Sequence, residues 1–268
     1  VLTCLSVCCS LQVRPVASFR QAGFDEALLG ALKKQGYTQP TPIQAQAIPA
    51  ALSGRDVIGM AKTGSGKTAA FVLPSLCHCM QQRELERGEG PIVVICAPTH
   101  ELAHQIYVEA RKFAKCYDLK VAAVYGGVEK QEQFKNLKAG VEVVVCTPGR
   151  LLDMIRMKAT NMKRVTYLVF DEADRMFDMG FEPQVRNLGE QVRPDRQTLL
   201  FSATMPRKVE TLARDMLTNP LRIQVGISFP FAFVICQSHA TYLRYVAYSG
   251  WTSRGSKSRC QAACTYSR

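Results

Sequence analysis

Two short segments, about a hundred residues apart, contain the side chains that could carry out chemistry. Residues 61–68 read Ala-Lys-Thr-Gly-Ser-Gly-Lys-Thr, a glycine-rich turn that ends in a lysine and a threonine. Residues 171–174 read Asp-Glu-Ala-Asp and directly follow the apolar run Tyr-Leu-Val-Phe. A glycine-rich turn can wrap phosphate groups, and a carboxylate at the end of a buried strand can bind a metal ion. The pair therefore predicts a site for a nucleoside triphosphate with Mg²⁺.

The first segment has the form of a phosphate-binding P-loop. Gly64 and Gly66 lack a Cβ, so the backbone N–H groups can approach phosphates closely. Lys67 is expected to neutralise the β- and γ-phosphates, and the Thr68 hydroxyl to bind Mg²⁺. An apolar segment at residues 56–60 precedes the loop and a helical pattern follows it, so the helix dipole also favours an anion. The alternative, a chance glycine- and serine-rich loop, does not account for this strand–loop–helix context.

Composition indicates a globular protein with a basic balance. Hydrophobic residues make up 47% of the 268 positions, enough for a sizeable core. The net charge of +12 suits a polyanionic partner, but residues 1–22 and 227–268 contain basic and no acidic side chains. Much of the excess lies in these ends, so charge alone indicates nucleic acid only weakly. No apolar run reaches transmembrane length, and we expect no membrane partner.

The eleven cysteines do not follow a zinc-binding pattern. Cys77 and Cys79 are too close in sequence for a ligand pair, and the remaining cysteines lack a matching pair at ligand spacing. We expect the five cysteines in the middle of the chain to be small buried hydrophobes in a reducing compartment. They are Cys77, Cys79, Cys96, Cys116 and Cys146.

Apolar runs alternate with amphipathic patterns through residues 23–226, which we interpret as one domain. Strands are expected at 56–60, 92–97, 121–125, 142–146, 166–170 and 197–201. Helices are expected at 25–35, 43–52, 67–82, 101–116, 129–139, 149–157 and 206–217. The alternation predicts an α/β fold, a mostly parallel sheet with helices on both faces. Ligands of such sheets collect at the carboxyl ends of the strands, so the two chemical segments should converge there.

The two ends of the chain break this alternation. Residues 1–22 and 227–268 have no clear period, and we expect both to be irregular extensions outside the domain. Such segments bury too little apolar surface to offset their ordering entropy. Two interpretations are open: disordered basic segments, or translated sequence that is not native coding sequence.

Further motifs, in order along the chain, make residues 23–226 resemble the first RecA-like domain of the DEAD-box ATP-dependent RNA helicases. Residues 36–44 resemble the family's Q motif, and residues 171–174 are the four letters of the family name. The resemblance implies a RecA-like P-loop fold with ATP and Mg²⁺ as cofactors. It implies ATP contacts from nine residues: Phe24, Gln44, Ala61, Thr63, Gly64, Ser65, Gly66, Lys67 and Thr68.

Within this set the resemblance assigns individual roles. Gln44 would read adenine and Phe24 would stack on it. Lys67, Asp171 and Glu172 would be the catalytic residues. Asp171 and Thr68 would hold Mg²⁺, the former through water because Mg²⁺ keeps part of its hydration shell. Glu172 would orient the attacking water, the alternative being an ordinary surface carboxylate after a strand.

Other matched motifs imply contacts with RNA and a coupling element. The RNA-contacting positions are Pro98, Thr99, His100, Glu101, Gly126, Gly127, Thr147, Pro148, Gly149 and Arg150. Thr147 and Arg150 could instead be a helix cap and a solvated side chain. Ser202 and Thr204 would hydrogen-bond Asp174 and couple hydrolysis to strand separation, the alternative being ordinary turn hydroxyls. The family has arginine at the position of His100, which could simply be solvated; arginine is always charged, so we expect weaker RNA binding here.

The resemblance covers one RecA-like domain, and no second such domain follows Gly226 in the sequence. We therefore expect the ATP-binding half of a helicase that unwinds RNA duplexes, with little ATPase activity and no unwinding by this chain alone. A non-catalytic truncated module that competes with the full-length enzyme for nucleotide, RNA or protein is the alternative. A P-loop GTPase is disfavoured because no guanine-specific element is found. Residues 175–181 and 193–197 look most like splicing-associated members, so we expect spliceosomal proteins as partners and a nuclear location, with the cytoplasm as the alternative.

Overall fold

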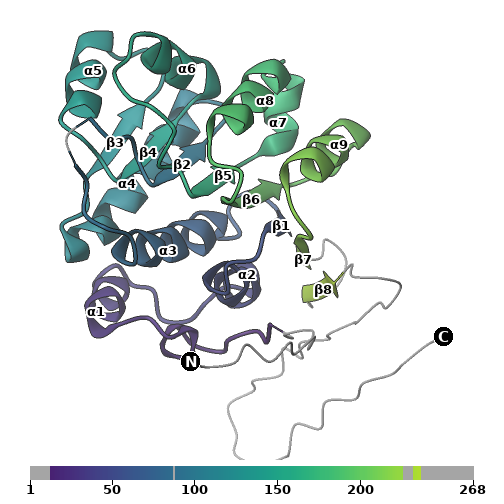
Figure 1. The fold of residues 1–268 in the computed structure, drawn as a ribbon. Helices are drawn as coiled ribbons and strands as arrows, with labels where there is room; N and C mark the ends of the chain where they lie inside the picture. Colours follow the sequence, from purple (N-terminus) through teal and green to yellow (C-terminus); the bar gives the residue numbers. More distant parts are fainter. Residues whose placement is uncertain (1–12, 87, 226–231, 237–268) are drawn as a thin grey trace, which may run out of the picture.

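The computed structural model describes residues 13–86, 88–225 and 232–236 (Figure 1). Its centre is an eight-stranded sheet in the order β3-β4-β2-β5-β6-β1-β7-β8. The first seven of these strands run parallel, and β8 pairs antiparallel with β7 at one edge. The strands are β1 (Val57–Met60), β2 (Val93–Cys96), β3 (Val121–Val124), β4 (Val143–Cys146), β5 (Tyr167–Phe170), β6 (Gln197–Ser202), β7 (Leu221–Val225) and β8 (Ala232–Cys236).

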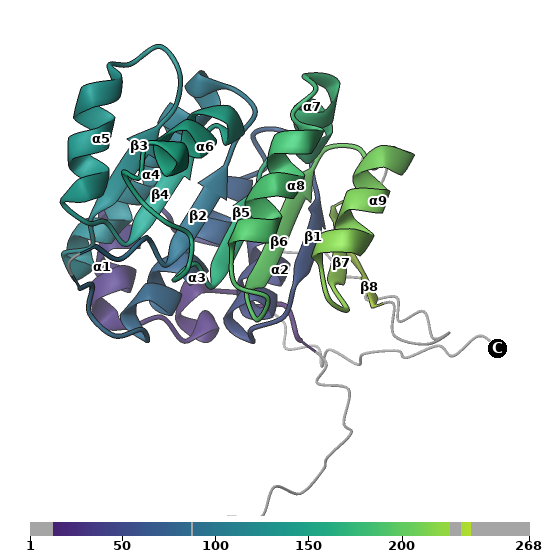
Figure 2. The same cartoon turned by 45° about the horizontal axis from the view of Figure 1, so that its top comes forward.

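Nine α-helices cover the two faces of the sheet within the described residues (Figure 2). Helices α1 to α4 pack on one face and α5 to α9 on the other. The helices are α1 (Glu26–Lys34), α2 (Pro42–Leu52), α3 (Lys67–Met80), α4 (His100–Ala114), α5 (Lys130–Lys138), α6 (Pro148–Arg156), α7 (Ala173–Asp178), α8 (Glu182–Gln191) and α9 (Arg207–Met216). Short 3-10 turns lie at Phe19–Ala22 and Lys115–Tyr117.

The strands form this sheet because their side chains are apolar on both faces. Along β5, for example, Tyr167 and Val169 join the core beneath α1 to α4, while Leu168 and Phe170 join the core beneath α5 to α9. A strand buried on both faces reads as a continuous apolar run, which is why six strands are visible in the sequence. The expected α/β architecture is confirmed.

The structure contains elements that the sequence does not predict. Strand β7 alternates buried Leu221 and Ile223 with the more exposed Arg222 and Gln224, because it lies near the edge of the sheet. Helices α7 and α8 follow the acidic segment; α7 has only six residues, too few for a helical period to be recognised.

The expected irregular extension at residues 227–268 is corrected in one part. Within that range the structure places β8, whose register pairs Val234 with Ile223 of β7. The rest of that range and residues 1–12 lie outside the described residues. The expectation that residues 1–22 lie outside the domain is wrong for residues 13–22, because Phe19 is 5% exposed in the core beneath α1 to α4 and the N–H of Val16 donates to the carbonyl of Ala45 at 2.9 Å. None of the helices in the described part of the chain is both long and apolar enough to cross a membrane.

The core beside the P-loop depends on a close approach between β1 and β6. A Cβ placed on Gly59 would lie 2.4 Å from Cε1 of Phe201, so only glycine lets this ring cross the strand. The Phe201 ring packs on Phe71 of α3, with centroids 5.3 Å apart. The strand before the P-loop, the helix after it and the strand that ends at Ser202 are thereby packed together.

Candidate functional site

The P-loop connects the end of β1 to the start of α3, at the carboxyl edge of the sheet. Gly66 precedes α3 with a φ of 89°, and Gly64 has a φ of 79°, a region that favours glycine. Lys67 is 5% exposed, and its Nζ donates a hydrogen bond of 3.1 Å to the carbonyl of Ala61. The half-buried Thr68 lies beside it in the first turn of α3. The loop is thus held ready with a buried cation at its base.

Gln44 connects the Q-motif segment directly to the P-loop. Its Nε2 donates to the carbonyl of Gly66 at 3.0 Å, and its Oε1 accepts from the N–H of Thr41 at 2.9 Å. A Cβ on Gly66 would lie 2.6 Å from this Nε2, so the contact requires glycine. An amide offers two N–H donors and two acceptor lone pairs, so Gln44, which is 2% exposed, keeps one N–H and one lone pair without a partner among the described residues.

Two hydroxyls near this loop lack a hydrogen-bond partner among the described residues. They are Ser65 Oγ in the P-loop and Thr41 Oγ1 beside Gly66, and both are buried. Buried hydroxyls are normally hydrogen-bonded, because an unmade bond costs about 1–3 kcal/mol. Their position next to a glycine-rich turn fits a polar ligand such as a polyphosphate.

Asp171 begins the acidic segment directly after β5. Its N–H donates to the carbonyl of Cys96 at 2.9 Å, and its Oδ1 accepts from the N–H of Glu172 at 3.0 Å. Burial raises the pKa of Asp171 to about 6; the Lys67 ammonium opposes this, and the neighbouring carboxylates of Glu172 and Asp174 add to it. A buried carboxylate with an elevated pKa gains from a nearby metal cation.

Glu172 is held in place on both sides. It is 4% exposed and adopts a φ of 54° where α7 begins, so it is not the surface carboxylate of the alternative interpretation. Its Oε1 accepts from the Thr63 hydroxyl at 3.3 Å, and its Oε2 from an Arg175 Nη at 3.0 Å. Sequence reasoning did not identify Arg175 as part of the site; its spacing of three residues on a helix was the available signal.

Asp174 makes the hydrogen bonds that the sequence predicts for it. Its Oδ2 accepts from the N–H and the hydroxyl of Thr204, at 2.9 and 2.7 Å. Its own N–H donates to Ser202 Oγ at 3.2 Å. Burial acts to raise the pKa of Asp174, but these hydrogen bonds outweigh it and the pKa is lowered. The carbonyl of Ser202 in turn accepts from the N–H of Ala61, so one residue touches both the acidic segment and the P-loop.

The donor set suits Mg²⁺ bound together with a polyphosphate. No cluster of three or more His, Cys, Asp and Glu side chains that could hold a metal occurs in the part of the chain that the structure covers. Mg²⁺ needs no such cage, since it typically takes one or two carboxylates, substrate phosphates and water. Asp171 and the hydroxyl of Thr68 provide that kind of partial site at one edge of the sheet.

The predicted RNA-contacting segments lie at the carboxyl ends of the strands, as the P-loop does. They follow β2, β3 and β4, which are neighbours in the sheet, so their carboxyl ends lie side by side. Pro98 and Thr99 precede α4, and the Thr99 hydroxyl caps this helix by accepting from the N–H of Leu102 at 3.3 Å. Gly126 and Gly127 form the turn after β3, with a φ of 81° at Gly127. Thr147 precedes α6, whose first residues are Pro148, Gly149 and Arg150.

Two basic side chains of these segments differ in how they are held. Arg150 donates to the carbonyl of Val128 at 3.1 Å and to Gln133 Oε1 at 3.4 Å, so it is fixed rather than freely solvated. His100 is exposed and pairs through Nδ1 with Oε1 of the neighbouring Glu101 at 3.1 Å. A carboxylate beside His100 competes with a phosphate for the same ring.

Phe24, predicted to stack on adenine, is buried in the core. It is 6% exposed and belongs to the core beneath α1 to α4, so little of its ring surface is accessible. The five middle cysteines are free thiols. Cys79, Cys96 and Cys146 are buried as expected, whereas Cys77 and Cys116 are only half-buried.

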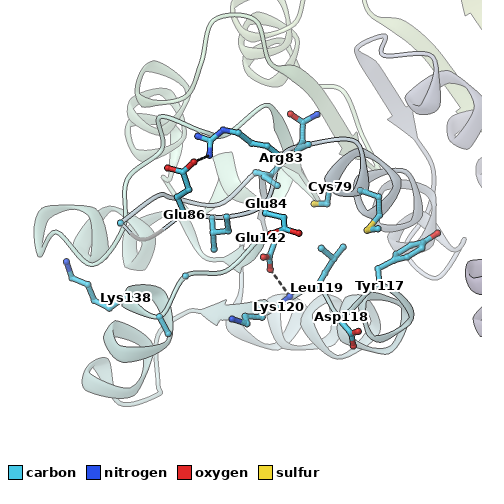
Figure 3. Close-up of a pocket in the computed structure, with 17 residues that line it drawn as sticks. Cys79, Arg83, Glu84, Glu86, Tyr117, Asp118, Leu119, Lys120, Lys138 and Glu142 are labelled. Atoms are coloured by element: carbon cyan, nitrogen blue, oxygen red, sulfur yellow. Dashed lines mark hydrogen bonds and ion pairs between the residues drawn. The ribbon is translucent and has the colours of Figure 1, made fainter.

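A separate cavity of about 580 Å³ lies at the amino ends of the strands, on the side of the sheet opposite the P-loop (Figure 3). Its walls come from the segments that precede β2, β3 and β4, including Arg83, Leu119, Lys120 and Glu142. The Glu142 carboxylate accepts from the N–H of Lys120 at 2.8 Å. Because the P-loop follows β1, this cavity is not part of the candidate nucleotide site.

Comparison with known proteins agrees with this geometry. Residues 41–212 match the profile described as "DEAD/DEAH box helicase". The "DEAD-box ATP-dependent RNA helicase 24" of Oryza sativa subsp. japonica is 68% identical over 213 residues, which are 80% of this chain and 28% of that protein. The "ATP-dependent RNA helicase DDX42" of Homo sapiens is 62% identical over 213 residues, 80% of this chain and 23% of that protein.

This chain thus spans less than a third of the length of these relatives. The matched profile covers well over half of the chain, from the residue before α2 into α9, and includes the P-loop and the Asp-Glu-Ala-Asp segment. The chain therefore belongs to the DEAD/DEAH box helicase family.

Proposed function

We propose that this chain is the ATP-binding, RNA-contacting first RecA-like domain of an ATP-dependent RNA helicase that unwinds RNA duplexes. One observation carries the proposal: Ser202 hydrogen-bonds both the P-loop at Ala61 and the acidic segment at Asp174. A conformational change of the P-loop at the phosphates can be transmitted by these hydrogen bonds through Ser202 to Thr204 and the chain that follows. The names of the relatives, ATP-dependent RNA helicases, support the same activity.

In this proposal the chain's own residues bind and orient the reactants. Lys67 and the P-loop N–H groups hold the β- and γ-phosphates. Asp171 and Thr68 hold Mg²⁺, which when bound neutralises phosphate charge. Glu172, fixed by Thr63 and Arg175, accepts a hydrogen bond from the attacking water and orients it.

Adenine selection is assigned to Gln44. Its remaining N–H donor and acceptor lone pair match the N7 acceptor and the N6 amino group of adenine. Guanine presents O6, an acceptor, in place of the amino group, so the same amide would meet a mismatched edge. The Q-motif amide can thus distinguish the two bases without moving away from Gly66.

RNA is assigned to the edge formed by the segments after β2, β3 and β4. The N-termini of α4 and α6 point at this edge and favour phosphate. The fixed Arg150 adds a permanent charge, while His100 adds a weaker one. We place the protein in the nucleus with spliceosomal partners on the resemblance of residues 175–181 and 193–197 to splicing-associated members; fluorescence microscopy of a tagged chain tests the location.

Nucleotide competition tests the proposed site. Labelled ATP bound to the chain should be displaced by ADP at a much lower concentration than by GDP. Replacing Gln44 by alanine should bring the two competition curves together while the protein stays folded. Equal displacement by ADP and GDP from the unaltered chain would remove adenine recognition, and with it the assignment of Gln44.

A further inference from the structure

The edge strand β3 has an open side that the ATP and RNA sites do not use. β3 comes first in the sheet order and pairs only with β4 among the described residues. The carbonyls of Lys120 and Val124 accept N–H groups from the β4 side. Because main-chain groups alternate in direction along a strand, those of Val121 and Ala123 point away from the sheet.

A groove of about 550 Å³ runs along this open edge. One wall is a stripe of side chains spaced four residues apart, Tyr107, Arg111 and Lys115, on α4 and the turn that follows it. The opposite wall is α5, with Glu132 among its lining residues. Residues 119–123 line the groove between these walls, and at Leu119 and Lys120 the groove meets the cavity of Figure 3.

The groove carries an excess of positive charge. Arg111, Lys115 and Lys120 line it and are exposed. None of the three takes part in an ion pair among the described residues. Glu132 is the single carboxylate among the residues that line this groove. The β3 edge thus combines main-chain groups that make no strand pairing with three cations that make no ion pair among the described residues.

We propose that the β3 groove binds an extended acidic segment of a protein partner, which adds to β3 as a further strand. Val121 and Ala123 offer two N–H and two C=O groups to the segment, the usual basis of strand addition. Carboxylates on alternate residues share one face of the segment, the face towards α4, where Arg111 and Lys115 select for acidic sequence.

Other occupants fit the groove less well. Residues 1–22 and 227–268 of this chain contain no Asp or Glu and so lack the complementary charge. A second copy would bring the same three cations against themselves. RNA would leave the main-chain N–H and C=O groups of β3 unpaired.

Fluorescence polarisation with the 268-residue chain tests the proposal. The probe is a fluorescein-labelled peptide of alternating valine and glutamate, about eight residues long. Saturable binding that weakens with salt is expected, and the double change Arg111→Glu/Lys115→Glu should weaken it by about tenfold or more. Lys112→Glu makes the same kind of charge change on the same helix but lies outside the groove, and should alter affinity by less than about twofold.

Amide hydrogen exchange on the ¹⁵N-labelled chain provides a second readout. Peptide binding should slow exchange at Val121 and Ala123, whereas the N–H groups of Ala122 and Val124 already face β4 and should change little. Absence of binding, equal binding of a valine–lysine peptide, or an equal loss in the Lys112→Glu variant would overturn the proposal. So would a uridine oligonucleotide that binds through Arg111 and Lys115 when the acidic peptide does not.

Discussion

Replacing Asp171 by asparagine should remove a specific pH dependence from the stability of the fold. The side chain is 2% exposed, and its pKa rises from 3.8 to about 6, chiefly through burial. Between about pH 4 and 6 the folded protein holds a proton that the unfolded chain has released, so stability falls as pH rises through this window. The difference between the two pKa values corresponds to about 3 kcal/mol.

Urea unfolding at constant ionic strength, from pH 4 to pH 7.5, measures this effect. Asparagine keeps the acceptor for the Glu172 N–H but cannot titrate. The free energy of unfolding of the unaltered chain, relative to Asp171→Asn, should therefore drop by up to about 3 kcal/mol over this range.

Asp174→Asn is the matched control, because the pKa of Asp174 is lowered and its titration in both folded and unfolded states lies below this range. This variant should lose stability but keep most of the pH dependence that Asp171 causes, because Asp174 is the smallest of the contributions that raise the pKa of Asp171. A flat difference curve for Asp171→Asn would show that burial does not perturb this carboxyl, and would refute the electrostatic description of the site.

Two further changes test the packing and the RNA edge. Gly59→Ala should destabilise the fold by about 1–3 kcal/mol in urea, because its Cβ would collide with Phe201, whereas Gly30→Ala in α1 has open space and should be neutral or stabilising. His100→Arg should tighten binding of single-stranded RNA by about threefold at low salt and steepen its salt dependence, as measured by fluorescence polarisation. An unchanged affinity would place His100 outside the RNA path.

Much of the site is predictable from the sequence because its residues lie at strand ends. The end of a buried strand is visible as an apolar run followed by polar residues, and parallel strands bring those ends to one edge. The contact of Asp174 with Thr204 spans thirty positions, yet it follows from this rule once both strands are identified. The positive φ of Gly66 is consistent with the use of glycine in the P-loop turn.

Contacts between side chains from different elements are less accessible to sequence reasoning. Arg175 reaches Glu172 only because α7 begins at that carboxylate, and a six-residue helix gives no period to recognise. The Q motif is enough to predict that Gln44 reads adenine. Its hydrogen bond to the Gly66 carbonyl cannot be predicted in this way, because it depends on how α2 packs on α3. Strand β8 is not predicted because its short apolar run lies in a segment without the strand–helix alternation that marks residues 23–226.

Titration calorimetry with Mg²⁺-ATP tests whether Lys67 holds the phosphates of ATP. The unaltered chain should bind, and Lys67→Ala should lose at least about tenfold in affinity, because the buried ammonium that pairs with the phosphates is removed. Lys62→Ala, a change to an exposed lysine of the same loop, should alter affinity by less than about threefold. Equal affinities of the unaltered chain and Lys67→Ala would show that Lys67 does not bind the phosphates.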